Sequence, residues 1–311
     1  GFFPATIDIT SPLGTTKYPV ELSLDNIHLF ADKATVALAE TGNINNTQAV
    51  LNINSNSVLP WGWQASTEAT WLTLTPNNDS NQLTITADSS LLTTDEITTA
   101  EITLSGNDET TAIADTIQVS FYKSEINTEN NTLSIVANTD GIATNPLLPQ
   151  YYVAVNNELR SYHLYTNELL STTVISPVDT ELEQLIVHPD ASKLLAKAIE
   201  TTVIDENTTE TTTHRYQIDL SDMSIIELAD IDITNEPVKF IRIDGRYFLT
   251  TAILEFADEN LVRQGFDGPN AFFARAFNVA EKNQALFALD VSAGDESMSI
   301  KRIDVSVNDF S

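Results

Sequence analysis

The chain has 311 residues, of which 42% are hydrophobic and 19% charged, so it holds enough apolar material for two ordinary domains and is unlike a disordered acidic tail. Its 44 acidic and 15 basic residues give a formal net charge of -29, which disfavours nucleic acid and anionic membrane surfaces as partners. The absence of cysteine excludes disulfides and thiolate nucleophiles, and no apolar run approaches the roughly 20 residues of a membrane-spanning helix.

Alternation of apolar and polar residues, the two-residue period of a strand, recurs along nearly the whole chain and predicts an all-β protein. The first alternating stretch is residues 5–10. We expect residues 1–16 to form an N-terminal strand or linker that ends a preceding module.

Residues 17–126 are predicted to form an immunoglobulin-like β-sandwich. Polar turn clusters separate seven short alternating segments, at residues 19–24, 34–39, 49–53, 71–75, 82–87, 99–104 and 116–122. Short strands spaced in this way are what a two-sheet sandwich of immunoglobulin type requires.

The last of these strands shows how its two faces separate. Ile117, Val119 and Phe121 alternate with Gln118 and Ser120. Because successive residues of a strand point to opposite faces, the apolar set predicts a core face and the polar set a solvent face.

All three tryptophans fall in this region, at Trp61, Trp63 and Trp71. We expect Trp71 to fill the space between the sheets. Trp61 and Trp63 flank Gly62 and share one face of a strand, so both are buried or both are offered to a ligand such as a sugar ring. They are the candidate ligand-binding residues.

The segments at residues 71–74, 83–87 and 100–104 resemble the BACON family of bacterial immunoglobulin-like modules. The resemblance covers residues 17–124 and rests on a Trp-led strand, a second alternating strand and an Ala-x-Ile strand. It implies a module that sits beside other domains in an exported protein. No sugar-binding residue is carried over from it.

A polar, turn-rich stretch at residues 124–132 predicts a linker, with a boundary near residue 127. The remaining residues, 127–311, divide into about four units of roughly 38 to 54 residues, each with about four short strands. Units of this size predict β-propeller-like repeats, whose small sheets pack face to face.

Two segments of this region resemble YVTN-type or quinoprotein-like propellers, with a coverage of residues 132–311. One is residues 151–164 followed by Thr166-Asn167-Glu168. The other is residues 187–195, in which Ala191 stands where such repeats usually have the glycine of Pro-Asp-Gly.

About four blades are few for a propeller, because most rings have more. An unclosed array leaves sheet faces and edges bare, which invites pairing with another chain. Three sources of neighbours are open: further blades in a longer parent chain, a second subunit through self-association, or a compact four-blade closure. We favour the longer parent chain, with further domains beyond these repeats.

Motifs of the common catalytic classes are absent from the sequence. The four histidines have no metal-ligand spacing, and no nucleophile elbow or phosphate-binding glycine loop is present, so we expect no enzyme. No cofactor is required. Calcium is the candidate ion, with Asp219, Asp222, Asp230 and Asp232 as candidate ligands, because hard oxygen donors cluster there.

The predicted function is binding or adhesion, with a glycan or protein ligand, by an exported bacterial protein that is extracellular or on the cell surface. Lysine is scarce, threonine, asparagine and aspartate dominate the polar residues, and no start Met is present. The sandwich would be a spacer or a binding module. A structural subunit of an extracellular assembly and a propeller enzyme with an unrecognised site are the alternatives.

Overall fold

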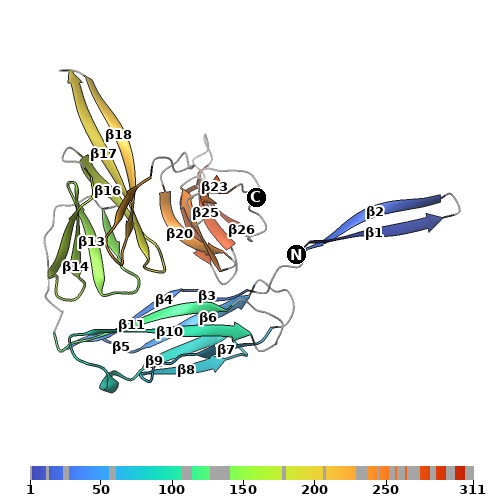
Figure 1. The fold of residues 1–311 in the computed structure, drawn as a ribbon, viewed down its shortest axis with the longest axis horizontal. Helices are drawn as coiled ribbons and strands as arrows, with labels where there is room; N and C mark the ends of the chain where they lie inside the picture. The colour runs from blue at the N-terminus through green and yellow to red at the C-terminus, as the bar shows by residue number, and fades with distance from the viewer. Residues whose placement is uncertain are drawn as a thin grey trace.

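The computed structural model is almost entirely β-strand, which confirms the predicted fold class (Figure 1). A single 3-10 turn, η1 (Ser89–Leu91), interrupts the strands of the described residues. The described residues are 2–11, 14–23, 28–55, 61–106, 114–126, 141–176, 180–205, 208–228, 237–243, 245–251, 256–257, 263–264, 274–280, 285–291 and 298–304.

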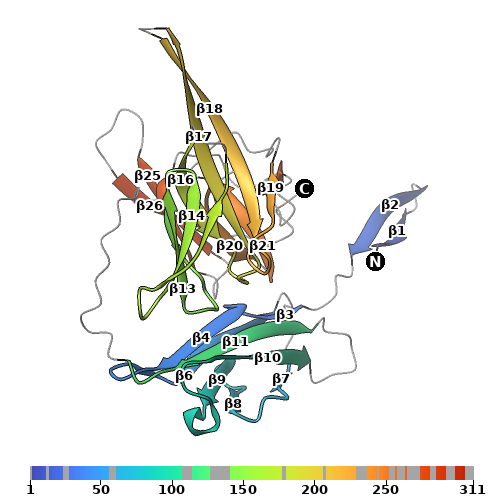
Figure 2. The same cartoon turned by 60° about the vertical axis from the view of Figure 1, so that its left-hand side comes forward.

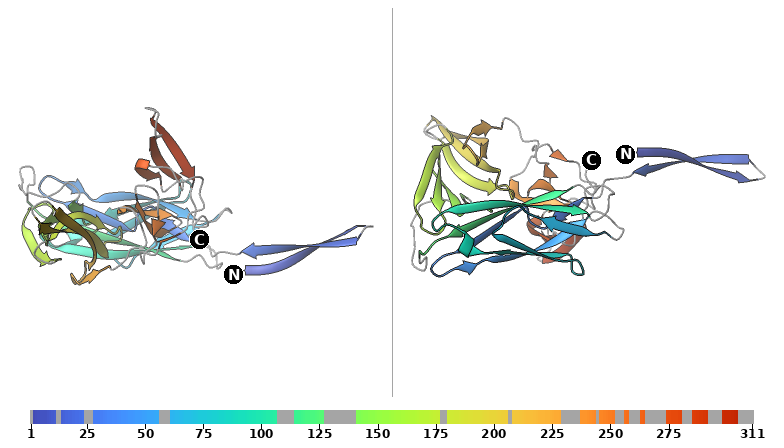
Figure 3. Two further views of the ribbon diagram at one scale, coloured as in Figure 1. Left: turned by 90° about the horizontal axis from the view of Figure 1, so that it is seen from above. Right: turned by 60° about the horizontal axis from the view of Figure 1, so that its bottom comes forward.

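The first two strands, β1 (Phe2–Ser11) and β2 (Gly14–Ser23), form an antiparallel sheet of their own. Figures 1 and 3 show this hairpin projecting away from the rest of the chain. The expectation that residues 19–24 begin the sandwich is therefore wrong, and so is the boundary at residue 17. An alternating pattern predicts a strand but does not say with which strand it pairs.

Two facing sheets then form the predicted sandwich. One sheet has the order β3 (Leu29–Ala31), β6 (Gln48–Ser55), β9 (Gln82–Ala87), β8 (Leu72–Asn77). The other has the order β5 (Asn45–Asn46), β4 (Thr35–Glu40), β11 (Asp115–Lys123), β10 (Ile97–Gly106), β7 (Trp63–Ser66). β4 runs parallel to β11, and the remaining pairs of the sandwich are antiparallel.

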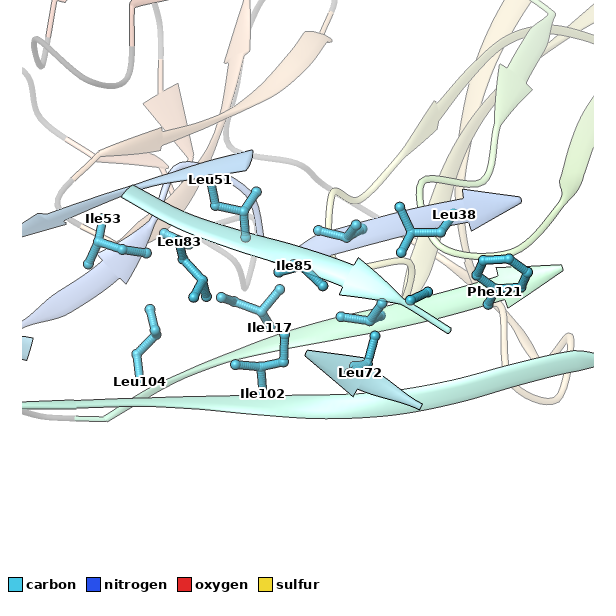
Figure 4. Close-up of a cluster of buried hydrophobic side chains, with 14 of the residues drawn as sticks. Leu38, Leu51, Ile53, Leu72, Leu83, Ile85, Ile102, Leu104, Ile117 and Phe121 are labelled. Carbon is cyan, nitrogen blue, oxygen red and sulfur yellow. The ribbon is translucent and has the colours of Figure 1, made fainter. Parts of the chain in front are cut away.

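The core of the sandwich lies between these sheets (Figure 4). Ile117, Val119 and Phe121 are fully buried there, as their alternation predicts. Trp71 is also buried, and its ring meets Phe121 edge-on with the ring centroids 6.2 Å apart, which confirms its predicted core role. Full burial of side chains of this size contributes about 1.5–3 kcal/mol each.

The second half of the chain consists of successive antiparallel sheets whose strands follow sequence order. The first sheet contains β12 (Ile142–Thr144), β13 (Gln150–Val155), β14 (Glu158–His163) and β15 (Leu169–Val174). The second contains β16 (Thr180–Val187), β17 (Lys193–Asp205), β18 (Thr208–Asp219) and β19 (Ile225–Glu227).

The third sheet contains β20 (Pro237–Ile243), β21 (Arg246–Thr251), β22 (Phe256–Ala257) and β23 (Arg263–Gln264). The fourth, three-stranded in the described residues, contains β24 (Ala274–Ala280), β25 (Ala285–Val291) and β26 (Met298–Asp304). These four successive sheets follow the order of the four predicted units, and we call them the array.

Consecutive residues of β17 show how the first three sheets stack. Leu194 packs with Leu159 in the core between the first and second sheets, whereas Leu195 packs with Phe240 between the second and third. The second sheet thus buries both faces, which is the packing expected of a propeller blade. This explains the continuous apolar run at residues 194–196 in place of strict alternation.

The turn between β16 and β17 holds Ala191 in the left-handed region, with φ of 63°. The left-handed conformation destabilises the folded state by about 1–2 kcal/mol when the residue has a Cβ. Glycine avoids this cost, but its greater backbone freedom in the unfolded chain lowers folding stability by about 0.4–1 kcal/mol. We expect Ala191→Gly to raise the free energy of unfolding by about 0.5–1 kcal/mol in urea titrations. Ala37→Gly, on an extended strand, should lower it, and a loss in both variants would contradict the strain argument.

Candidate functional site

Equivalent loops of three successive sheets rest on the sandwich, each joining the first strand of its sheet to the second (Figure 2). In the first sheet, the carbonyl of Leu147 accepts a hydrogen bond from the Ser120 hydroxyl. In the second, the carbonyl of Pro189 accepts one from the Thr35 hydroxyl at 2.9 Å. In the third, Gly245 packs on the sandwich. The array is therefore docked on the sandwich.

The outer face of β11 is the main surface of this contact. Ser120 is 1% exposed and Tyr122 is 6% exposed, and the Tyr122 ring stacks on Tyr165 of the array with centroids 5.4 Å apart. The prediction that Ser120 lies on a solvent face is thus wrong. Its small hydroxyl side chain lets a loop carbonyl approach the sheet and satisfies the hydrogen bond of that carbonyl.

Arg242, on β20, ties the third sheet to the sandwich with a nearly buried guanidinium. Its Nη2 donates to both carboxylate oxygens of Asp115, at 3.1 and 2.9 Å, and its Nη1 donates to the carbonyl of Ala31 at 2.5 Å. Asp115 also accepts the backbone N–H of Ala31 at 3.2 Å. Both charges are paired and hydrogen-bonded, as burial of an ion pair requires.

Aromatic rings and a tight turn complete this contact. The guanidinium carbon lies 5.7 Å from the Phe30 ring and 5.2 Å from the Tyr247 ring. Gly245 has φ of 81°, and a Cβ added there would lie 3.3 Å from the Phe30 ring. The position therefore favours glycine for both conformation and space.

Beside this contact lies an open groove of about 830 Å³, which we call the seam groove. Pro146, Pro189 and Tyr247 of the array border it. Its sandwich side is formed by the residues before β4, by β4, by one residue of β5 and by β6, at residues 32–38, 46 and 48–51. The groove lies between β4 of one sheet and β6 of the other, and residues of the docked array form its rim.

One border of the seam groove is the outer edge of β4. The Ala34 carbonyl accepts a hydrogen bond from Gln118 N at 2.8 Å, so even-numbered residues of β4 pair with β11. Thr35 and Ala37 therefore direct their backbone N–H and C=O groups to the other edge. Among the described strands, β5 covers that edge, and it does so at residues 39–40.

The opposite border is the outer edge of β6. The Thr47 carbonyl accepts a hydrogen bond from Ala87 N at 2.9 Å, so odd-numbered residues pair with β9. The backbone groups of Gln48 and Val50 therefore face the groove. β3 covers this edge at residues 53–55, and the Val50 side chain is 50% exposed. Among the described strands, none pairs with these backbone groups at residues 35 and 37 of β4 or at residues 48 and 50 of β6.

His188 directly precedes Pro189, which lines the seam groove, and its ring packs beneath this loop. Its buried ring lies edge-on to Phe240 and Tyr247, and its Nδ1 is 2.5 Å from Asp190 Oδ1. Burial raises the pKa of Asp190, but hydrogen bonds from His188 and Ser192 outweigh it and lower that pKa to about 2. The carboxylate of Asp190 is therefore ionised at neutral pH.

The predicted tryptophan pair does not form a sugar-stacking surface. Trp63 is 2% exposed, and half-buried Trp61 packs against the sandwich core. The hypothesis that both rings are offered to a ligand is therefore wrong for Trp63. The two-residue spacing predicts that the rings share a face, but it does not say whether that face is covered.

The structure describes two of the four predicted calcium ligands. Asp219 accepts hydrogen bonds from the backbone and hydroxyl of Ser221, and the hydroxyl hydrogen bond, the largest cause, lowers its pKa. Asp222 accepts the backbone N–H of Ser224. Both carboxylates close their own turn. Asp230 and Asp232 lie outside the described residues, and the described part holds no group of three or more metal-binding side chains.

His214 of the second sheet contacts two carboxylates. Its Nδ1 lies 2.8 Å from Glu227 Oε1 and its Nε2 lies 3.1 Å from Glu200 Oε2. Hydrogen bonds to Glu227 first, and then to Glu200, raise the pKa of His214. His163 differs, because burial lowers its pKa.

This difference predicts opposite pH dependences. The His214 contribution to folding stability should be fully present below its ordinary pKa of 6.5 and be lost as the pH rises through the raised value. We therefore expect the loss of unfolding free energy in His214→Gln to be largest at acidic pH and to shrink toward pH 8. The loss in His163→Gln should grow as the pH rises. Equal losses at all pH values would contradict both assignments.

Arg242, Asp115 and Tyr247 are the site residues that sequence analysis missed. The signal available was Arg242 itself, a charged residue between Ile241 and Ile243 in an apolar strand. Such a residue needs a buried partner. Nothing in the sequence identifies that partner as Asp115, which lies on another domain.

No protein-family model matches the chain, and no curated protein matches it. Among solved structures it is similar to the human desmocollin-1 ectodomain, with a TM-score of 0.25 and 11% identity over 96% of this chain and 57% of that one. The chain thus spans little more than half the length of that ectodomain.

Two further solved structures are similar at the same level. Human protocadherin-24 EC1-2 has a TM-score of 0.22 and 10% identity over 65% of this chain and 94% of that one. The protocadherin gammaB4 extracellular domain has a TM-score of 0.23 and 9% identity over 97% and 59%. TM-scores this low carry no argument about fold or partners. In the described part of the chain, no helix is long and apolar enough to cross a bilayer.

Proposed function

We propose that the protein is an exported, non-enzymatic binding protein that holds an extended segment of a protein ligand in the seam groove. The observation that carries the proposal is the pair of strand edges that border the groove. Thr35 and Ala37 on one side, and Gln48 and Val50 on the other, turn their backbone groups toward it. An extended peptide satisfies such groups by adding a strand.

The net charge of the chain indicates which peptide segments the seam groove binds most readily. With a formal net charge of -29, the protein attracts basic segments and repels acidic ones over a distance set by the salt concentration. Asp32 and Lys33, which line the groove, offset each other locally. The favoured ligand is therefore an extended peptide that is basic or neutral.

A protein ligand fits the groove better than a glycan. Sugar rings stack on exposed aromatic faces, and Trp63 is buried. The groove has a single aromatic side chain, Tyr247, among its lining residues. Location on a bacterial surface is part of the same proposal, and it rests on the polar composition and on the resemblance of residues 17–124 to BACON modules.

The test is selection of phage-displayed decapeptides on the full chain, followed by affinity measurement on Ala37→Pro and Ala37→Ser. Proline removes the N–H that faces the groove but leaves the β4–β11 ladder intact. Serine keeps that N–H. We expect Ala37→Pro to bind at least about tenfold more weakly, the loss of about one hydrogen bond, and Ala37→Ser to bind as the parent does.

Three outcomes would contradict this function. One is that no peptide is enriched. Another is that Ala37→Pro, with an unchanged melting temperature, binds the selected peptides as tightly as the parent chain. A binding loss equal in Ala37→Ser would also contradict it, because the backbone group would then not be responsible.

A second function, a structural subunit of an extracellular assembly, is favoured by one observation. The β1–β2 hairpin projects away from both domains, and among the described strands none pairs with its outer edges (Figure 1). The alternative of a propeller enzyme stays a prediction from the sequence.

A further inference from the structure

The seam groove is closed at both ends, because the two segments that border it pair there. At one end, the Asp32 N–H donates to the carbonyl of Asn52 at 2.9 Å. At the other end, Ala39 pairs with Asn46. Among the described strands, no ladder joins the two segments between these ends. A ligand chain therefore enters the groove from its open side and leaves by the same side at both ends.

The distance between the closed ends limits the length of an extended ligand. The open stretch of the β4 border comprises the six residues 33–38. An extended chain rises about 3.3 Å per residue, so six residues span about 20 Å. The groove volume of about 830 Å³ lies in the usual range of ligand pockets, about 300–1,000 Å³. Five or six ligand residues thus occupy the groove, and the residues that flank them lie in solvent.

The inner wall of the groove belongs to the hydrophobic core of the sandwich. Val36, Leu38 and Leu51 line the groove and are members of the core cluster. Leu38 and Leu51 come from different sheets and lie in that same cluster (Figure 4). Ala49 also lines the groove and packs against the core, but it is only partly buried. The core is therefore accessible from the groove at Ala49.

Ala49 provides a place for a single ligand side chain. The pairing of residues 31 with 53 and 39 with 46 at the two ends places Val36 level with residues 48 and 49 by interpolation. Leu51, the next inward residue of β6, is 1% exposed and covers its own part of the wall. At Ala49 the side chain ends at a methyl group. The uncovered part of the wall is thus one residue long.

A strand added to the free edge of β4 directs its side chains by the alternation of that strand. Residues opposite each other in a ladder point to the same face of a sheet. Ligand residues opposite Thr35 and Ala37 therefore face outward, whereas the ligand residue opposite Val36 faces the core and meets Ala49. A buried apolar anchor of this kind carries much of the binding free energy of an interface.

We propose that the ligand of the seam groove is a short internal segment of five or six extended residues, with one apolar side chain seated on Ala49 as its anchor. This inference rests on the proposed function and adds to it the length of the ligand and the chemistry of its central side chain. Backbone hydrogen bonds supply affinity in strand addition, and a pocket for an alternate side chain supplies specificity.

Alanine scanning of the selected decapeptides on the parent chain tests the anchor without altering the protein. We expect one apolar position at which alanine weakens binding at least about tenfold, while its two neighbours change binding less than about threefold. Truncation to six residues around that position should keep the affinity within about threefold. Losses spread evenly along the peptide, or an affinity that falls steadily as the peptide is cut to six residues, would overturn the inference.

Ala49→Leu tests the same place from the protein side. Leucine occupies the space of the anchor and should weaken binding at least about tenfold. Ala100→Leu adds the same atoms at another partly buried position beside the core, on β10, and should bind the peptides as the parent chain does. Unchanged binding by a folded Ala49→Leu chain would overturn the inference. If melting curves show that this variant does not fold, the peptide scan decides.

The inference and the proposed function fail in distinguishable ways. Peptides that are enriched and require the Ala37 N–H, but have no anchor position and bind Ala49→Leu normally, would leave the function standing and overturn the inference. If no peptide is enriched, the proposed function fails and the inference fails with it.

Discussion

Arg242→Ala is expected to lower the free energy of unfolding by about 3–5 kcal/mol, the typical loss when one partner of a buried ion pair is removed. The guanidinium pairs with both oxygens of Asp115 and also donates to the Ala31 carbonyl. Its side chain is 5% exposed and that of Asp115 is 20% exposed, so solvent screens the pair little. Alanine leaves the carboxylate without its cation.

The distribution of tryptophan makes this loss measurable domain by domain. All three tryptophans lie in the sandwich, so their fluorescence reports on that domain, whereas far-ultraviolet circular dichroism reports on both. In urea, the two signals should change together in the parent chain and separate in Arg242→Ala. Arg246→Ala removes an equal charge from an exposed position and should cost less than about 0.5 kcal/mol. Equal losses in the two variants would contradict the proposed role of Arg242.

Trp63→Ala is expected to cost a similar amount, about 3–5 kcal/mol, because it empties a large volume in the sandwich core. Trp63 is among the largest fully buried side chains. Thermal unfolding followed by circular dichroism measures the loss. Trp61→Ala, at a half-buried position, should cost clearly less. A Trp63→Ala chain that melts like the parent would show that the ring is not in the core.

This prediction changes how a sugar-binding test is designed. If Trp61 and Trp63 are both replaced by alanine, the sandwich is destabilised, and any loss of binding follows from that. Trp63→Phe keeps an aromatic ring in the core and Trp61→Ala removes the half-buried one. Glycan binding that survives both single variants would exclude the pair as a sugar site.

The strands of the sandwich are predictable from the sequence because one face of each is buried and the other is polar. The segment at residues 82–87 coincides with β9 for this reason. Period-two alternation separates the two faces but does not identify what covers them. Ser120 and Tyr122 lie on the face that a single domain would expose, and the array buries them.

That alternation does not reveal a strand's partners also explains where the structure of β2 and β17 differs from the prediction. β2 has the alternation of a sandwich strand and pairs instead with β1, because pairing is decided by the turn between them and by the available partners. β17 is buried on both faces and loses its alternation at residues 194–196. The blade-like repeats are still recognisable there, since turn residues mark the ends of their strands.

The candidate site could not be read from the sequence. The seam groove joins residues 32–38, 46 and 48–51 of the sandwich with Pro146, Pro189 and Tyr247 of three different units of the array. Pro189 belongs to a segment that resembles a repeat motif, but that motif does not place it beside the sandwich. The proximity of these residues results from docking. Arg242 and Asp115, which hold the third sheet in place, are 127 residues apart.

Three loops and the Arg242–Asp115 ion pair connect the array to the sandwich, so we expect the two parts to behave as one rigid unit. Electron–electron distance measurement between spin labels tests it most directly, since a chain without cysteine accepts two labels cleanly. Labels at exposed Thr73→Cys of the sandwich and Thr172→Cys of the array should give one narrow distance distribution, which broadens when Arg242→Ala is added. A broad distribution in the parent chain, unchanged by Arg242→Ala, would contradict the claim.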